Sequence, residues 1–214
     1  MEYRTKEEQV ADFLREGIIS GSIARGARIK QVEIAQLLKT SITPVREALK
    51  LLAAEGYLSG SSFKGATVVS FDATTSREII NLRMLLEAEL VRGAVERLTS
   101  EDVKELQALA AEFEAAAVNQ DSSLARGVNY RFHRRLYTIA DQKQTFHFVQ
   151  ILWARYPFDV INRIDGRATR AAAEHKELLQ QMCAGDVAAA TLTMRRHIES
   201  GWEELRDTIE EPRK

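Results

Sequence analysis

Three of the four histidines in this chain fall in three different predicted helices, and these are His133, His175 and His197. Asn129 precedes His133 by four residues, so the two side chains lie on one face of the same helix. Neutral imidazoles from several helices that converge in a bundle core can hold Zn²⁺, Ni²⁺ or a similar divalent ion. A single histidine on an apolar face is more often a packed core or surface residue. The pattern therefore offers a candidate metal site beside that ordinary interpretation.

A second candidate for chemistry is residues 41–58, SITPVREALKLLAAEGYL, which carry an arginine in the first turn of a predicted helix. Arg46 and Lys50 are one turn apart and lie away from the apolar stripe of that helix. An arginine here could bind a guanine edge through two donors, and the helix N-terminus favours an anionic partner. The alternative is a solvated face on which both cations pair with Glu47 and other acidic neighbours. The other candidate DNA contacts are Lys30, Ser41, Thr43, Lys64 and Gly65.

The N-terminal third of the chain has the pattern of a small three-helix unit. Apolar residues recur at helical spacing over residues 6–20, and a shorter helix is predicted over residues 31–41. In the third helix, Thr43 is the expected N-cap, Pro44 is the first helical residue and Gly56 ends the helix. Two short strands around a Ser/Gly/Lys turn follow, and the second is expected to include Val68, Val69 and Phe71. Three helices and a hairpin predict a winged helix-turn-helix.

Beyond residue 72 the pattern changes to long amphipathic helices with almost no glycine or proline. Their expected ranges are 74–98, 100–118, 122–140, 145–156, 168–184 and 187–209. The three candidate histidines fall in the third, fifth and sixth of these helices. The expected fold is therefore mainly α: a winged helix-turn-helix over residues 1–71 and an all-helical bundle over residues 72–214.

The composition is that of an ordinary globular protein, since 45% of the 214 residues are apolar and 29% are charged. Apolar runs such as FVQILWA are far shorter than the roughly 20 residues of a membrane-spanning helix. We therefore expect a soluble cytoplasmic protein with no membrane partner. The single cysteine, Cys183, excludes an intramolecular disulfide, and its apolar helical surroundings predict a buried thiol.

The net charge of −1 means that any nucleic acid would have to be bound by a local concentration of charge. Residues 1–70 hold ten Lys and Arg against eight Asp and Glu. From the totals of 30 and 31, this leaves 20 against 23 in the rest of the chain. The asymmetry is weak, and it favours an anionic partner for the N-terminal part.

This chain resembles the GntR family of bacterial transcriptional regulators in the segment TSITPVREALKLLAAEGYL and in the KGATV that follows. The helical remainder resembles the FadR-type effector domain, so the resemblance spans essentially the whole chain. It implies a homodimer that binds double-stranded DNA at a palindromic operator. The family usually has an arginine where this chain has Ile42, and a basic or polar residue where it has Val32. These differences indicate an unusual operator and leave more of the base discrimination to Arg46.

The resemblance extends to the candidate metal site. In the metal-binding group of FadR-type domains, an Asp or Asn is followed after three residues by a His, and two more histidines come from later helices. The matching segments are NYRFH, AEHKEL and MRRHIE, which implies a divalent transition metal held by Asn129, His133, His175 and His197. Asparagine in place of the more frequent aspartate removes one negative charge. His147 has no counterpart, and we interpret it as structural.

One arginine of the helical part is a candidate effector ligand. Arg83, in NLRMLLEAE, matches an arginine that the resemblance places at the effector cavity. There it would hold the carboxylate of a small organic acid. Its ordinary alternative is a salt bridge with Glu87, four residues later on the same helix.

These features predict a dimeric, ligand-responsive transcriptional regulator, and the resemblance implies repression as the commoner mode. One alternative is a metal-dependent, hydrolase-like enzyme, because an open site of three imidazoles could activate water. The sequence has neither an HExxH pairing nor a Gly-x-Ser-x-Gly elbow, so an enzyme is not expected. The other alternative is a DNA-binding protein without an effector. Metal content and effector-sensitive DNA affinity would distinguish the three.

Overall fold

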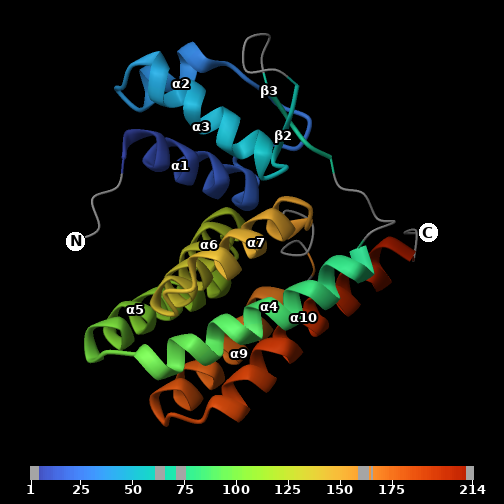
Figure 1. Ribbon diagram of the computed structural model, residues 1–214. Helices are drawn as coiled ribbons and strands as arrows, with labels where there is room; N and C mark the ends of the chain where they lie inside the picture. The colour runs from blue at the N-terminus through green and yellow to red at the C-terminus, as the bar shows by residue number, and fades with distance from the viewer. Residues whose placement is uncertain (1–4, 61–65, 71–75, 159–163, 165, 211–214) are drawn as a thin grey trace.

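The computed structural model describes residues 5–60, 66–70, 76–158, 164 and 166–210, and it places a small N-terminal domain above a larger helical domain (Figure 1). The N-terminal elements are α1 (Lys6–Ser20), β1 (Arg28–Ile29), α2 (Gln31–Leu37), α3 (Ile42–Ala54), β2 (Leu58–Ser59) and β3 (Ala66–Val68). The later helices are α4 (Ser76–Arg97), α5 (Ser100–Val118), α6 (Ser122–Ile139), α7 (Lys143–Ala154), α9 (Arg167–Cys183) and α10 (Val187–Glu210). This confirms the expected fold class, a winged helix-turn-helix followed by an all-helical bundle.

The first helix begins and ends where its local chemistry requires. Thr5 accepts a hydrogen bond from the backbone N–H of Glu8 at 3.3 Å, and the Glu8 carboxylate accepts one from the N–H of Thr5 at 3.0 Å. This reciprocal capping box satisfies two donors that a helix N-terminus leaves without partners. At the other end, Gly21 adopts a left-handed φ of 77°, which glycine reaches without steric cost.

The start of α3 differs from the prediction. The helix begins at Ile42 with Ser41 as its N-cap residue, so the expectation that Thr43 is the N-cap was wrong. Pro44 is the third helical residue rather than the first. A proline is tolerated anywhere in the first turn because those N–H groups have no intrahelical partner, and so Pro44 could not fix the boundary to one residue. Gly56, with a φ of 88°, follows the end of the helix as expected.

The wing is a three-stranded antiparallel sheet in the order β1-β3-β2. Arg28 pairs with Thr67 and Leu58 pairs with Val68. The strand β1 was not predicted, because two residues inside a turn-rich connector carry no alternating pattern. The strand β3 ends at Val68, so the expected extension to Val69 was wrong, and Phe71 lies outside the described residues.

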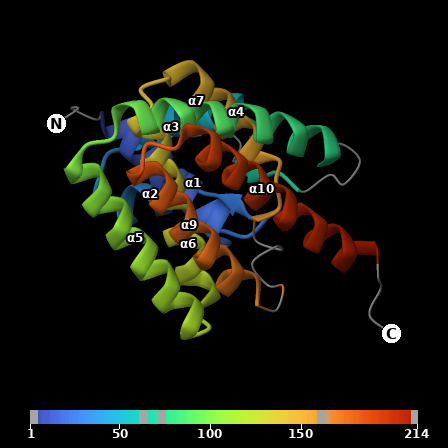
Figure 2. The same ribbon diagram turned by 90° about the horizontal axis from the view of Figure 1, so that it is seen from below.

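The helical domain is a bundle in which α4 packs against α10 and α7, while α5 packs against α6 and α9 (Figure 2). The observed boundaries lie within two residues of the predicted ones. A capping box between Thr99 and Asp102 fixes the start of α5. The prediction of a buried thiol was wrong, because Cys183 is the last residue of α9 and its side chain is exposed.

The two domains meet where α1 lies against α6. Asp12 on α1 forms an ion pair with Arg134 on α6, with 2.8 Å between Oδ2 and Nη2. Further along α6, Arg126 donates to the backbone carbonyl of Ser20, the last residue of α1. The junction is therefore made in part by charged side chains of α6 that reach the N-terminal domain.

A buried ion pair holds α1 to the end of α3. Arg15 donates from Nε and Nη2 to the two carboxylate oxygens of Glu55, each at 2.7 Å, and Arg15 also donates to Asp12. Both partners are almost fully buried, at 5% and 2% exposure. A charge at this depth is tolerated only when it is paired.

We predict that Glu55→Ala lowers the free energy of unfolding by about 3 kcal/mol or more, because it leaves the Arg15 guanidinium buried with a single partner. Urea denaturation followed by circular dichroism would measure the change. The matched control is Glu33→Ala, since Glu33 forms a solvent-exposed pair with Lys30, and its loss should cost about 0–1 kcal/mol. Equal effects of the two substitutions would contradict the prediction.

A candidate metal and effector site and a candidate DNA-binding surface

The structure brings three histidines together from three helices. His133 lies on α6, His175 on α9 and His197 on α10, and their possible ligand atoms all lie within 4.8 Å of one another. The Nε2 atoms of His133 and His175 are 3.2 Å apart. His175 is also packed between rings, stacked on Phe132 with 4.3 Å between centroids. The periodicity of the sequence placed each histidine on its helix, and the bundle makes them converge.

Hydrogen bonds orient the ring of His133. The Tyr137 hydroxyl donates to the Glu87 carboxylate at 2.6 Å, so its only proton is used there. The same hydroxyl lies 3.3 Å from Nδ1 of His133, and only a protonated Nδ1 can complete that contact. In this tautomer the lone pair of His133 is on Nε2, directed at His175. A carboxylate therefore sets, through a tyrosine, which nitrogen of His133 can bind a metal.

His197 is oriented in the same way by a more direct contact. Its Nδ1 lies 2.6 Å from a carboxylate oxygen of Glu174, to which it donates its proton. This leaves the Nε2 lone pair of His197 free to face the cluster. Carboxylates that fix histidine tautomers are a regular feature of metal sites in proteins.

Burial keeps all three imidazoles neutral. It lowers the pKa of His133 to about 4. The pKa of His175 and that of His197 are also lowered well below the usual value, in both cases chiefly by burial. The neighbouring histidines add to this shift for His175, and Arg167 adds to it for His197. Neutral imidazole is the form that binds a metal ion. At neutral pH each ring is therefore an uncharged imidazole, with one nitrogen that can bind a metal ion.

The donor set fits a divalent transition metal. Two imidazole nitrogens bound to tetrahedral Zn²⁺ are about 3.3 Å apart, which is close to the 3.2 Å between His133 and His175. Asn129, one helical turn before His133, has a side-chain oxygen that is buried without a hydrogen-bond partner among the described residues. Asn129 and His197 line the same small cavity. An oxygen in that position is a fourth available donor.

The cavity beside the cluster has a volume of about 30 Å³ and is lined by two arginines. Arg83 donates to Glu87 at 2.6 Å, and its guanidinium lies 4.4 Å above the ring of Tyr156. Arg83 therefore forms the salt bridge with Glu87 that was the alternative to an effector role, and it also lines the cavity. The second arginine of the cavity is Arg167, which donates to Glu174 at 3.0 Å and to the carbonyl of His197 at 3.3 Å.

Sequence reasoning missed Arg167 and Glu174. A signal was present, because Arg167, Ala171 and His175 follow one another at intervals of four and lie on one helix face. Glu174 carries no comparable mark, since an acidic residue next to a histidine is common on solvated helices. The fourth histidine, His147, is exposed on α7 and lies outside the cluster.

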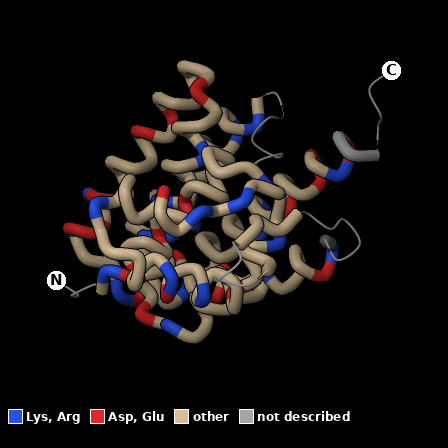
Figure 3. Tube along the Cα trace, turned by 90° about the horizontal axis from the view of Figure 1, so that it is seen from above, with Lys and Arg blue, Asp and Glu red and all other residues tan. Residues whose placement is uncertain are grey.

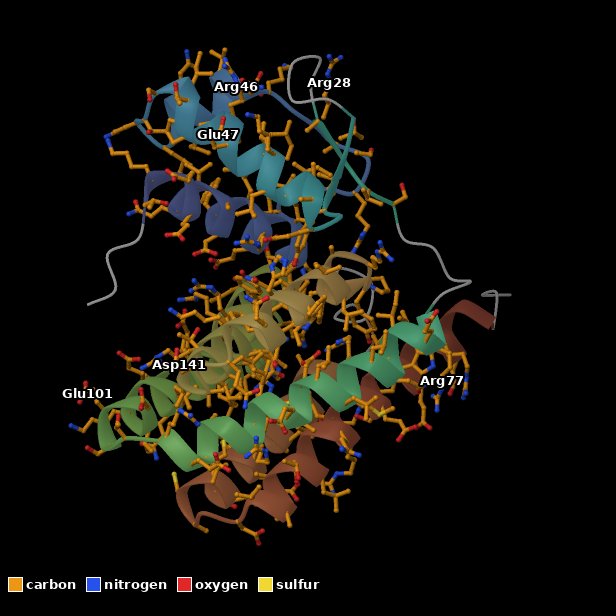
Figure 4. The ribbon with its side chains drawn as sticks, viewed as in Figure 1. Arg28, Arg46, Glu47, Arg77, Glu101 and Asp141 are labelled. Atoms are coloured by element: carbon orange, nitrogen blue, oxygen red, sulfur yellow. The ribbon has the colours of Figure 1, made fainter. Side chains whose placement is uncertain are left out.

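The candidate DNA-binding surface is the outer face of α3. Arg46 lies on the side of the N-terminal domain that faces away from the bundle, and Ser41 and Thr43 are exposed in the same turn (Figure 4). Lys50 forms an exposed ion pair with Glu47 at 2.9 Å, as the alternative interpretation expected. Positive and negative residues are interspersed over the molecule (Figure 3). Lys64 and Gly65, the expected wing contacts, lie outside the described residues.

Comparison with known proteins identifies both domains. The family described as bacterial regulatory proteins, gntR family, matches residues 6–68, and the FCD domain matches residues 78–200. This chain belongs to the GntR family. It is 32% identical to the HTH-type transcriptional regulator McbR of Escherichia coli over 160 residues, and this alignment covers 72% of each protein. It is 28% identical over 188 residues to the Nta operon transcriptional regulator of Aminobacter aminovorans, covering 86% of this chain and 87% of the relative.

Solved structures of the family have the same fold. The structure of E. coli McbR/YncC superimposes with a TM-score of 0.80 at 27% identity, over 97% of this chain and all of that one. A GntR regulator from Rhodococcus sp. RHA1 gives a TM-score of 0.69 at 21% identity, over 95% of this chain and 99% of that one. This GntR-family protein is therefore a DNA-binding transcriptional regulator with an FCD domain, and not an enzyme. Among the helices of the described chain, none combines the length and apolar composition of a membrane span.

We predict that Tyr137→Phe lowers the free energy of unfolding by about 1–3 kcal/mol, because it removes one donor to the buried Glu87 carboxylate and leaves Nδ1 of His133 without a partner. The control is Tyr130→Phe. The Tyr130 hydroxyl is buried with no hydrogen-bond partner in the described part of the chain, so its removal should change stability by less than about 1 kcal/mol. Chemical denaturation of both variants would measure the difference, and a larger loss for Tyr130→Phe would contradict it.

Proposed function

We propose that this regulator is a repressor that binds its operator as a homodimer and responds to a small carboxylate through a divalent metal in its FCD domain. The observation that carries this proposal is the convergence of three neutral imidazoles beside two buried arginines. Neutral nitrogen donors suit a metal cation, and guanidinium groups can donate hydrogen bonds to the oxygens of a carboxylate. Together they favour a ligand that binds the metal and the arginines at once.

The proposed metal ligands are Asn129, His133, His175 and His197, and Zn²⁺ or Ni²⁺ suits this set of one oxygen and three nitrogen donors. When bound, the metal would supply a positive centre with coordination positions left open for an anionic ligand. Two hydrogen bonds support the assignment, because His133 donates from Nδ1 to Tyr137 and His197 donates from Nδ1 to Glu174. Both rings then present Nε2 to the cluster.

The proposed effector is an organic acid of a few heavy atoms. Arg83 and Arg167 line the cavity, and each is already neutralised by a glutamate, so the walls alone carry little net charge. A bound divalent metal would add positive charge to the site and so favour the binding of an anion. A volume of about 30 Å³ corresponds to the space of about one water molecule, so the carboxylate must displace water or widen the cavity.

The proposed operator is a palindrome read by two copies of the N-terminal domain. A single helix in the major groove contacts few bases, and a two-fold symmetric pair of half-sites multiplies the specificity. In this proposal residues 1–71 read the DNA, and residues 72–214 dimerise and bind the effector. Sedimentation equilibrium at micromolar concentration should give a dimer, and a monomer would contradict this part of the proposal.

The metal is tested by elemental mass spectrometry of protein purified without chelator or a polyhistidine tag. We expect near one divalent ion per chain in the wild type and little in the His133→Ala/His175→Ala double variant. His147→Ala is the matched control, because it removes a histidine outside the cluster, and it should retain the ion. An absence of metal even after resupply would leave a DNA-binding protein whose effector, if it has one, binds without metal.

We predict that Arg46→Ala reduces the preference for operator over random DNA by about 1–3 kcal/mol. An arginine that binds a guanine edge contributes to the discrimination between base sequences as well as to the affinity for DNA. Fluorescence anisotropy with both duplexes at one salt concentration would measure it. An equal loss of affinity for the two duplexes would instead make Arg46 a phosphate contact.

A further inference from the structure

An exposed apolar side chain precedes Arg46 by one turn on the outer face of α3. Ile42 is the first residue of the helix and is 41% exposed, whereas Val45 and Leu49 behind it are buried at 0% and 1%. Ile42 and Arg46 are four residues apart, so their side chains are neighbours along the helix surface. The residues on either side of Ile42, Ser41 and Thr43, are polar and also exposed.

The base edges of the DNA major groove offer one apolar group that such a side chain can contact, the C5-methyl of thymine. Along a helix, four residues advance by about 6 Å. Successive base pairs are separated by about 3.4 Å, so Ile42 and Arg46 can face bases one or two pairs apart. An isoleucine at the start of the helix can therefore distinguish thymine from cytosine by a contact with the methyl group.

We propose that Ile42 reads a thymine methyl one or two base pairs from the base held by Arg46. This inference rests on the proposed operator-binding role of α3 and adds to it the identity of a base. It assigns part of the direct readout to an apolar contact, so the operator half-site contains a thymine whose methyl group contributes to affinity.

The experiment begins with selection of binding sites from random duplexes by the full-length wild-type protein. Each selected thymine is then replaced by deoxyuridine, which removes only the methyl group. At one thymine per half-site we expect the wild-type affinity to fall about fourfold, as for the loss of one buried methyl. Ile42→Ala should bind the thymine and deoxyuridine duplexes equally.

The control is Val118→Ala, which shortens an apolar side chain that is 73% exposed at the end of α5, in the other domain. This variant should keep the wild-type response to deoxyuridine. The inference is overturned if every selected thymine accepts deoxyuridine without loss, or if Ile42→Ala keeps the same loss. If selection enriches no sequence at all, the operator-binding proposal fails, and this inference fails with it.

A second, independent observation concerns the contact between the wing and the bundle. Arg25, between α1 and β1, donates to the carbonyl of Tyr156 at 2.7 Å and to the carbonyl of Val69 at 3.1 Å. It also reaches the carbonyl of Ala154, the last residue of α7, at 3.5 Å. A guanidinium at a helix C-terminus satisfies carbonyls that have no intrahelical partner and complements the negative end of the helix dipole.

Tyr156 takes part in the contact with Arg25 and also lines the proposed effector cavity. Its ring lines the cavity with Asn129 and His197, and the guanidinium of Arg83 lies 4.4 Å from the ring centre. Phe158 packs edge-on against Tyr156, with 4.7 Å between centroids. One residue thus presents its ring to the cavity and its carbonyl to the DNA-binding domain.

We infer that Arg25 positions the wing according to the state of the cavity. A displacement of Tyr156 would move the carbonyl oxygen to which Nη2 of Arg25 donates. Because Nη1 of the same guanidinium donates to the carbonyl of Val69, the residue after β3, the displacement would also shift that end of the wing. This inference rests on the proposed metal site, since Asn129 and His197 share a cavity wall with Tyr156. It requires that the metal-bound and metal-free cavities prefer different positions of that residue.

Hydrogen exchange of the full chain, metal-free and with Zn²⁺ alone, tests this inference. In the wild type we expect Zn²⁺ to change deuterium uptake both in peptides that contain the histidines and in the peptide that contains β3. Arg25→Met keeps the length of the side chain but removes its donors, so it should retain the first response and lose the second. Arg28→Met, on the neighbouring strand, should retain both.

The histidine peptides serve as an internal check that Arg25→Met is folded. A Zn²⁺ response at β3 that persists in Arg25→Met, or that is absent from the wild type while the histidine peptides respond, would overturn the role of Arg25. If no peptide responds to Zn²⁺ in the wild type, the metal site itself fails and the coupling falls with it.

Discussion

The buried carboxylate of Glu87 is the interaction on which the helical domain depends. It is only 1% exposed and accepts hydrogen bonds from Arg83, Tyr137 and Trp153, at 2.6, 2.6 and 3.1 Å. An isolated carboxylate at this depth would be strongly unfavourable, so these donors are a condition of the fold as well as features of the site. They come from three helices, α4, α6 and α7, whose packing is therefore tied to one charged group.

The same carboxylate links the two halves of the candidate site. On one side it neutralises Arg83 and places it in the cavity wall, and on the other it acts through Tyr137 to direct a nitrogen of His133 at the cluster. Glu174 has the corresponding role for the second arginine, because it accepts hydrogen bonds from both Arg167 and His197. Each arginine is thus linked to a histidine by way of a glutamate, with Tyr137 as a further link in the case of Arg83. The charges of the site therefore form two similar units around a neutral cluster.

The parts of the structure that depend on local chemistry could be predicted from the sequence. Helical spacing and sparse glycine located the six long helices to within two residues, and the histidines on α6, α9 and α10 followed from them. The prediction failed where one residue type is compatible with several positions. A proline fits any position of the first helical turn, so Pro44 did not determine the residue at which α3 begins. Contacts set by tertiary packing left little trace, so the two-residue strand β1 and the pairing of Glu174 with His197 were not foreseen.

The junction between the domains has a consequence for the response of this regulator to ionic strength. Its ion pairs, Asp12 with Arg134 and Glu16 with Arg131, are partly exposed, unlike the buried pair of Arg15 and Glu55 inside the DNA-binding domain. Mobile ions screen exposed pairs over about 8 Å at physiological concentration but leave buried pairs and apolar cores almost unaffected. We therefore expect added salt to weaken the contact between the two domains before it weakens the packing within either domain.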